Sequence, residues 1–224
     1  MKTFYGVTME TPINKKLKNG HTMFDWIVRK RCYPSFCMRT LCGKEKITKE
    51  EIKFLKSKGC KIAFVIRDLT EIEVSGSDAS ACAARAIKSA FELGLPANKN
   101  IALFAQINPD WSINHNWMIS FARNLKDKGF VAGFIGNTDS SKNFNFDRQS
   151  SHYIQATKSS DYYNAVFMAT EPKLKSAPDK WEPYCPSAMK QTDISFWIGA
   201  DIYFDDIKAT DVYARDEKVL ENLF

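Results

Sequence analysis

Short apolar runs of strand length alternate with helical segments at least five times along this chain, and this alternation limits the folds that it can adopt. Strands are expected at residues 4–10, 35–41, 60–66, 101–105, 130–135, 164–170, 194–198 and 202–205. Helices are expected at residues 22–31, 49–58, 77–93, 113–128 and 147–156. Successive strand–helix units of this length predict an α/β fold with parallel strands joined by right-handed crossovers.

The local signals agree with this alternation. Residues 60–66 (CKIAFVI) are almost continuously apolar, which is typical of a parallel strand covered on both faces. Residues 77–93 are rich in alanine and are followed by Gly94 and Pro96, which favours a helix that ends at the glycine. Thr48 with Glu51 three positions later predicts a capping box.

No dinucleotide-binding glycine pattern follows the first strand, and no phosphate-binding loop occurs in the sequence. Repeated units without these motifs favour a closed (β/α)8-type TIM barrel over an open six-stranded sheet, with an irregular C-terminal half. The 224 residues are sufficient for one such domain, residues 1–224. Residues 209–224 are expected to form a polar tail outside the barrel.

Composition excludes several classes of protein. A hydrophobic content of 44% and a charged content of 26% are those of a soluble globular protein, and no apolar run approaches the ~20 residues that a membrane span needs. The net charge of +6 comes from Lys and Arg scattered over the expected helices, so solvated helix faces explain it better than a nucleic-acid site. The first residues lack a signal-peptide pattern, which predicts a cytoplasmic protein or one exported without a classical leader.

Metal and cofactor chemistry is not expected. The six cysteines contain no CxxC pair and several lie in apolar runs, so we expect reduced structural thiols, with a disulfide of Cys32 or Cys42 as the alternative. The three histidines form no HExxH or His-x-His spacing, which argues against a zinc site.

The fourth expected strand breaks abruptly into polar residues. After the apolar run 101–105 come Gln106, Asn108, Asp110 and Trp111. The carboxyl ends of barrel strands usually hold the site of an α/β protein, so this edge is interpreted as the rim of a site. The alternative is that the same residues only turn the chain into the next helix.

Polar residues at the other strand ends extend this rim. At such a rim, carboxylates can act as acid, base or nucleophile, tryptophans can stack on the faces of ring-shaped ligands, and amides can bind hydroxyls. Taken singly, each carboxylate could instead be a helix cap or an ion-pair partner. The candidate catalytic residues are Glu10, Asp110 and Glu171, and the candidate binding residues are Arg39, Arg67, Asp68, Gln106, Asn108, Trp111, Asn137, Asp139, Trp197 and Asp201.

Several motifs, in the same order, resemble a known family over residues 4–206. They are Gly6-Val7, the passage 59–62 (GCKI), the passage 78–96 that ends in LGLP, the passage 128–136 (KGFVAGFIG), and Phe196-Trp197 followed by Asp205. This order resembles the glycoside-hydrolase-like barrels first catalogued as a domain of unknown function, which are related to the family 25 lysozymes.

The resemblance implies a barrel with acidic residues at the ends of its first and fourth strands, acting on a glycan. This sequence has Thr8 at the first place and Gln106, Ile107 and Asn108 at the second. An amide cannot exchange a proton as a carboxyl group does, so either the acids have moved or the barrel no longer cleaves. The expected partner is a cell-wall or other polysaccharide, such as a peptidoglycan fragment, and the alternative is a non-catalytic glycan-binding or protein-interaction barrel.

Overall fold

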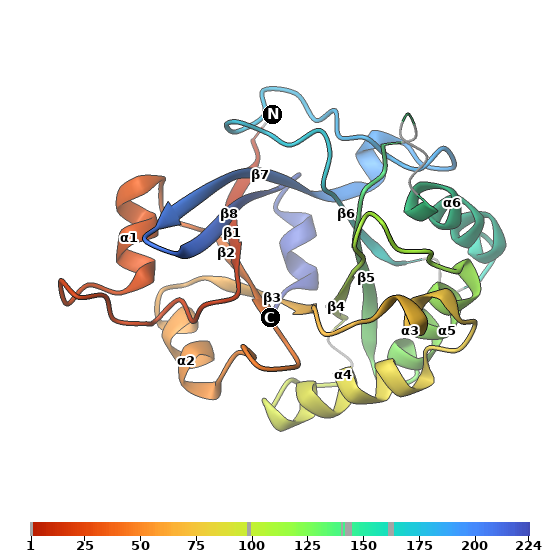
Figure 1. Ribbon diagram of the computed structural model, residues 1–224, viewed down its shortest axis with the longest axis horizontal. Helices are drawn as coiled ribbons and strands as arrows, with labels where there is room; N and C mark the ends of the chain where they lie inside the picture. The colour runs from red at the N-terminus through yellow and green to blue at the C-terminus, as the bar shows by residue number, and fades with distance from the viewer. Residues whose placement is uncertain (1, 98–99, 140, 142–144, 161–163) are drawn as a thin grey trace.

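Eight strands close into a barrel in which every strand pairs with its neighbours in chain order (Figure 1). The computed structural model describes residues 2–97, 100–139, 141, 145–160 and 164–224. The pairs from the first strand to the seventh are parallel, and the eighth strand runs antiparallel to both the seventh and the first. The closed barrel predicted from the alternation is confirmed.

The helices lie outside the ring of strands (Figure 1). The strands are β1 (Phe4–Met9), β2 (Phe36–Thr40), β3 (Lys61–Ile66), β4 (Ile101–Gln106), β5 (Phe130–Gly136), β6 (Val166–Ala169), β7 (Ile194–Phe204) and β8 (Ile207–Ala214). The helices are α1 (Met23–Lys30), α2 (Lys49–Ser57), α3 (Glu71–Ser75), α4 (Ser80–Glu92), α5 (His115–Lys126) and α6 (Asn145–Thr157), with the short 3-10 segments η3 (Gln191–Asp193) and η4 (Lys218–Asn222).

The C-terminal part differs from the prediction. The two short strands expected at 194–198 and 202–205 are one strand, β7, and the tail expected from residue 209 contains most of β8. Asp205 and Asp206 form a two-residue turn between the two strands, and Asp205 has a left-handed φ of 50°. Asp tolerates that conformation, so the pair supplies a hairpin turn that the apolar pattern alone did not reveal. The short helix α3 also lies in a segment predicted as loop.

Three phenylalanines fill the inside of the barrel. The rings of Phe36 and Phe104 both pack edge-on against Phe196, with centroids 5.4 and 5.7 Å apart. Gly133 faces the Phe104 ring so closely that a Cβ at this position would overlap it. The interior is therefore a packed layer in which glycine makes room for an aromatic ring.

The segment η4 covers the amino-terminal end of the barrel (Figure 1). Val219, Leu220 and Leu223 pack on the interior side chains. The backbone of Phe224 exchanges two hydrogen bonds of 3.0 Å with Ile62, near the start of β3. This end is closed, so any ligand cavity in the barrel opens at the other end.

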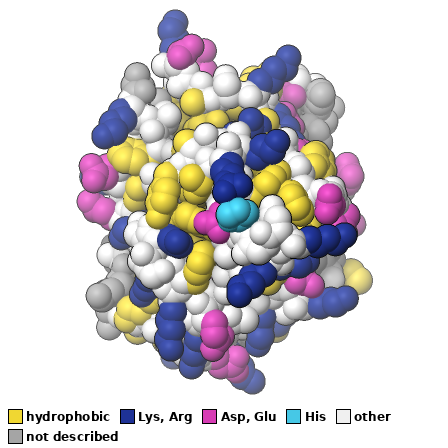
Figure 2. Space-filling model, turned by 90° about the vertical axis from the view of Figure 1, so that its left-hand side faces the viewer, with side chains coloured by type: hydrophobic (Ala, Val, Ile, Leu, Met, Phe, Trp, Pro, Cys, Tyr) yellow, Lys and Arg dark blue, Asp and Glu magenta, His cyan; other side chains and the backbone are white. Residues whose placement is uncertain are grey.

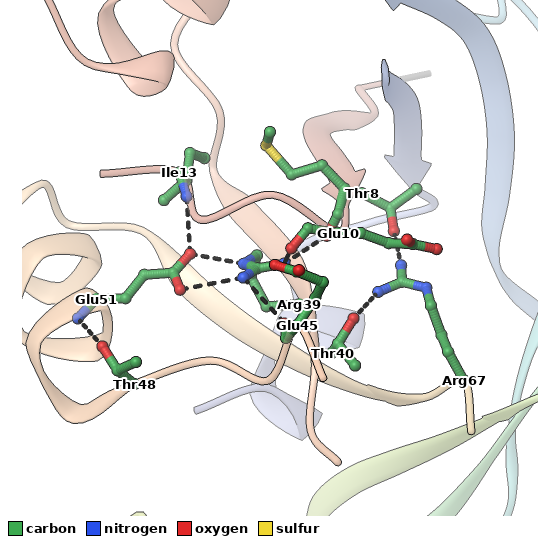
Figure 3. Close-up of polar contacts among 10 residues, drawn as sticks. Thr8, Glu10, Ile13, Arg39, Thr40, Glu45, Thr48, Glu51 and Arg67 are labelled. Carbon is green, nitrogen blue, oxygen red and sulfur yellow. Dashed lines mark hydrogen bonds and ion pairs between the residues drawn. The ribbon is translucent and has the colours of Figure 1, made fainter. Parts of the chain in front are cut away.

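A buried ion pair ties α2 to the barrel. The Arg39 guanidinium donates to both carboxylate oxygens of Glu51, at 2.6 and 3.2 Å, and to the backbone carbonyls of Met9 and Glu10 (Figure 3). Both side chains are at most 1% exposed. The predicted capping box is only half formed: Thr48 accepts from the Glu51 backbone N–H at 3.2 Å, but the Glu51 carboxylate pairs with Arg39 instead.

Basic and acidic side chains are interspersed on the face of the molecule that carries α1 (Figure 2).

All six cysteines are free, and four of them are buried. None of the helices in the described part of the chain combines the length and the apolar character that a bilayer span requires.

The contact between Gly133 and Phe104 predicts an overpacking defect. Gly133→Ala should lower the free energy of unfolding by about 1–3 kcal/mol, because the added methyl group must displace a buried ring. In the double variant Gly133→Ala/Phe104→Leu, the smaller leucine side chain leaves room for the added methyl group, so part of the lost stability should return. Chemical denaturation measures both variants, with Gly76→Ala as control because its Cβ would meet only an ordinary contact of 3.4 Å. Wild-type stability of Gly133→Ala would contradict this packing.

The Arg39–Glu51 pair predicts a large and position-specific loss of stability. Glu51→Gln should cost about 3–5 kcal/mol, because it leaves the Arg39 charge buried without its counter-charge. Glu50→Gln, an exposed neighbour on α2, is the matched control and should cost little. Thermal and urea unfolding measure the loss of stability in each variant. An equal loss in the two variants would show that the ion pair contributes nothing to stability.

Candidate functional site

A cavity of about 600 Å³ opens at the carboxyl ends of the parallel strands. It lies at the end of the barrel opposite η4, where the side chains that follow several strands converge. The lining comes from β1, β4, β5, β6, β7 and β8, from the loops after β1, β3, β4, β5 and β6, and from the turn between β7 and β8. The polar and charged residues among them are Thr8, Glu10, Thr11, Lys15, Arg67, Gln106, Asn108, Asn137, Thr170, Glu171, Lys173, Asp206, Lys208 and Thr210.

Arg67 is held in this cavity by three neutral acceptors. Its Nη2 donates to Thr8 Oγ1 at 2.6 Å, its Nη1 to Thr40 Oγ1 at 2.5 Å, and its Nε to Gln106 Oε1 at 3.1 Å. Figure 3 shows the guanidinium reaching between Thr8 and Thr40. Among the described residues, no carboxylate lies within ion-pair distance of this side chain.

Burial lowers the pKa of Arg67 to about 10, with an opposing upward contribution from the charge of Glu10 and a further downward one from Arg39. The guanidinium is removed from water, which penalises its charge, and hydroxyl and amide oxygens compensate only partly. At neutral pH the side chain is still protonated. The cavity therefore contains a positive charge without a counter-charge in contact.

Asp201 on β7 anchors one wall of the cavity. Its carboxylate accepts from Lys173 Nζ at 2.5 Å and from Thr210 Oγ1 at 2.6 Å, and it lies 3.1 Å from Lys208 Nζ. Burial acts to raise the pKa of Asp201, but these three partners outweigh it and the pKa is lowered. Asp201 thus holds three lining residues in place rather than lining the cavity itself.

Six of the residues predicted for the site lie together in this cavity. They are Glu10, Arg67, Gln106, Asn108, Asn137 and Glu171. Glu10 and Asn108 are exposed, Asn137 is buried, and Glu171 is partly exposed. Convergence of the strand ends at one mouth accounts for their proximity.

Four other predicted residues face elsewhere. Asp110 is exposed on the loop after β4 and is not among the cavity-lining residues. Trp111 is half-buried against the core. Asp68 pairs with Arg85 of α4 at 3.2 Å, and the buried Asp139 accepts from the backbone and hydroxyl of Ser141.

Two predicted binding residues are engaged inside the protein. Trp197 is 3% exposed, donates its indole N–H to the carbonyl of Pro172 at 2.7 Å and packs edge-on against Trp181. On β7 it alternates with the inward-facing Phe196, so its ring lies outside the barrel and offers no face for stacking on a sugar. Arg39 is fully buried by its pairing with Glu51.

Several lining residues were not predicted. Thr8 was noted only as a missing acid, and Lys208 and Thr210 belong to β8, which was predicted as tail. The signal for β8 was present in its β-branched and aromatic residues after the Asp205–Asp206 turn. Lys15 and Lys173 lie in loops, and no sequence pattern marked them.

Within the described part of the chain, no cluster of three or more His, Cys, Asp or Glu side chains is arranged to hold a metal ion. The cavity itself offers amides, hydroxyls, lysines, carboxylates and the guanidinium of Arg67.

Neither the models of known protein families nor the curated protein sequences match this chain. Solved structures do match. An uncharacterized protein of B. stearothermophilus aligns over 99% of this chain and 100% of its own, with a TM-score of 0.79 and 18% identity. A Tat-secreted protein of Mycobacterium tuberculosis, solved with L-tartrate, aligns over 97% and 98%, with a TM-score of 0.62 and 11% identity.

A muramidase from Acremonium alcalophilum aligns over 99% of this chain and 97% of its own, with a TM-score of 0.53 and 12% identity. The spore cortex lytic enzyme SleM of Clostridium perfringens aligns over 95% of this chain and 67% of its own, with the same TM-score and 11% identity. Identities this low establish architecture and not activity. The chain therefore has a glycoside-hydrolase-like barrel fold, similar to that of lysozyme-type enzymes.

Proposed function

We propose that this barrel binds a polysaccharide of the cell-wall type in the cavity at its carboxyl end and does not cleave it. The observation that carries the proposal is the position of Arg67. Its guanidinium is hydrogen-bonded to Thr8 and Gln106, which occupy the strand ends where the resemblance places acids. A cation and its neutral acceptors stand where a hydrolase of this fold would carry carboxylates.

The charge of Arg67 opposes glycoside cleavage. The transition state of glycoside hydrolysis resembles an oxocarbenium ion, and hydrolases stabilise its positive charge with a carboxylate. A partly buried guanidinium without a paired carboxylate acts in the opposite direction, and its partial removal from water strengthens the effect. At the ends of β1 and β4, Thr8 and Gln106 offer no carboxyl group as proton donor, and Arg67 adds a positive charge beside them.

The rest of the cavity suits a sugar ligand. Gln106, Asn108 and Asn137 offer amide donors and acceptors, and Thr170 and Thr210 offer hydroxyls. The apolar lining residues are Met9, Ile107, Pro109, Ile135, Met168, Ile198 and Ile207. Polar groups among apolar walls match the hydroxyls and the C–H faces of a pyranose ring. The names of two structural neighbours, a muramidase and a spore cortex lytic enzyme, support a wall glycan as the ligand class.

The second candidate is a hydrolase that uses Glu10 and Glu171, because both line the cavity. Glu10 is exposed, and glycosidases commonly keep the general acid in an apolar enclosure. The carboxylate of Glu171 accepts from the backbone N–H of Lys173 at 3.1 Å. These surroundings favour the binding function over the hydrolytic one.

Sedimentation with insoluble bacterial cell wall tests the proposal. The wild-type protein should pellet with the wall, while the turbidity of the suspension stays constant and no reducing sugar is released. Clearing of the suspension that disappears in Glu10→Gln or Glu171→Gln would establish the hydrolase instead.

A pair of asparagine variants locates the binding surface. Asn108→Ala should weaken retention on the wall roughly 2- to 10-fold, the effect of one or two lost hydrogen bonds. Asn116→Ala removes an equally exposed amide on α5, outside the cavity, and should leave retention unchanged. Equal retention of the two variants would place binding on another surface.

A further inference from the structure

We infer that the glycan bound by this barrel is acidic and that a sugar carboxylate binds to the guanidinium of Arg67. This inference rests on the proposed function and specifies the class of its ligand. It follows from a comparison of two arginines at the ends of adjacent strands, one of which has a carboxylate partner and one of which does not.

The first arginine, Arg39 on β2, has a full set of protein partners. Glu51 neutralises its charge in a two-point contact, and the carbonyls of Met9 and Glu10 accept further N–H groups. Its side chain is fully buried and does not line the cavity. This is how the chain stabilises a buried guanidinium that has only a structural role.

The second arginine, Arg67, follows β3 and has no such counter-charge. Three of its five N–H groups donate to Thr8, Thr40 and Gln106, all of them neutral. Within the described residues, its other two N–H groups have no protein acceptor. Because the three partners fix the plane of the guanidinium without neutralising it, the side chain is preorganised to receive an anion.

The lysines of the cavity differ from Arg67 because acids balance them. The lining contains the lysines Lys15, Lys173 and Lys208 and the acids Glu10, Glu171 and Asp206, three of each sign. Asp201, behind the lining, also accepts from Lys173 and lies 3.1 Å from Lys208 Nζ. Among the described residues no carboxylate is in ion-pair contact with Arg67, so this lack of a partner, and not the net charge of the cavity, distinguishes it.

A planar carboxylate matches the geometry of a guanidinium and neutralises it, whereas a neutral hydroxyl only replaces water. Carboxylates occur on glycans as uronic acids and as the lactyl ether of muramic acid. Both present the same anion, so the experiment has an arm for each source.

The test is calorimetric titration with two matched pairs of oligosaccharides. One pair is the α-1,4-linked trimer of galacturonic acid and the α-1,4-linked trimer of galactose. The other pair is the disaccharide of N-acetylglucosamine and N-acetylmuramic acid, and chitobiose. In at least one pair, the acidic member should bind wild-type protein roughly 10- to 100-fold more tightly, the range expected for a charge-assisted contact.

Variants assign this preference to Arg67. Arg67→Gln should bring the acidic and neutral members of the pair to within about twofold of each other, while Arg67→Lys keeps part of the preference. Arg85→Gln is the matched control, because Arg85 lies on α4 with Asp68 and Glu73 as partners and does not line the cavity. The thermal unfolding of each variant is recorded first, and the wild-type preference stands as a test even if Arg67→Gln does not fold.

Equal affinity within both pairs, or a preference that survives in Arg67→Gln, would overturn the inference. Wall sedimentation separates this failure from failure of the proposed function. Wild-type protein that pellets with wall but shows no acidic preference leaves the proposed function in place. If it neither pellets nor binds any of the four oligosaccharides, both are overturned.

Discussion

Closure of the sheet by the β7–β8 hairpin is the constraint on which the structure depends. β8 pairs along its length with β1, from Ala214 opposite Phe4 to Ala209 opposite Met9, and it pairs with β7 on its other side. Without it, β1 and β7 would each present an unpaired edge. Because the ring is closed, the ends of strands far apart in sequence meet around one cavity, and Thr8 and Gln106 both come within hydrogen-bonding distance of Arg67.

The two arginines at the ends of β2 and β3 show how a fold can keep its architecture while its chemistry changes. Arg39 is neutralised by Glu51 and serves the packing of α2. Arg67 keeps its charge and faces the cavity. The fold is shared with lysozyme-type barrels, but fold does not determine function. The residues at the carboxyl ends of the strands determine it, and here Arg67 lies there with neutral acceptors as its hydrogen-bond partners.

The alternation of strands and helices was sufficient to predict the closed barrel, because residues such as Lys61–Ile66 and Ser80–Glu92 have clear local patterns. That Glu10, Arg67, Gln106 and Asn108 lie together at the carboxyl ends also followed, because the strand ends of a closed barrel meet at one mouth. What could not be predicted depends on side-chain direction. Trp197 appears at a strand end in the sequence, yet the alternation along β7 turns it away from the interior. The sequence predicts Glu51 as the partner of Thr48 in a capping box, and only the tertiary structure brings Arg39 to its carboxylate.

The antiparallel direction of β8 gives the cavity an unequal rim. Around most of the mouth, a loop leads from each strand toward a helix, but beside β7 and β8 the rim ends in the two-residue turn of Asp205 and Asp206. Two residues added on each side of that turn would raise this wall while the pairing below it, and the side-chain alternation, stay unchanged. A change in the length of this hairpin would therefore make the cavity deeper or shallower, and suit it to ligands of different length, while the packed interior stays untouched.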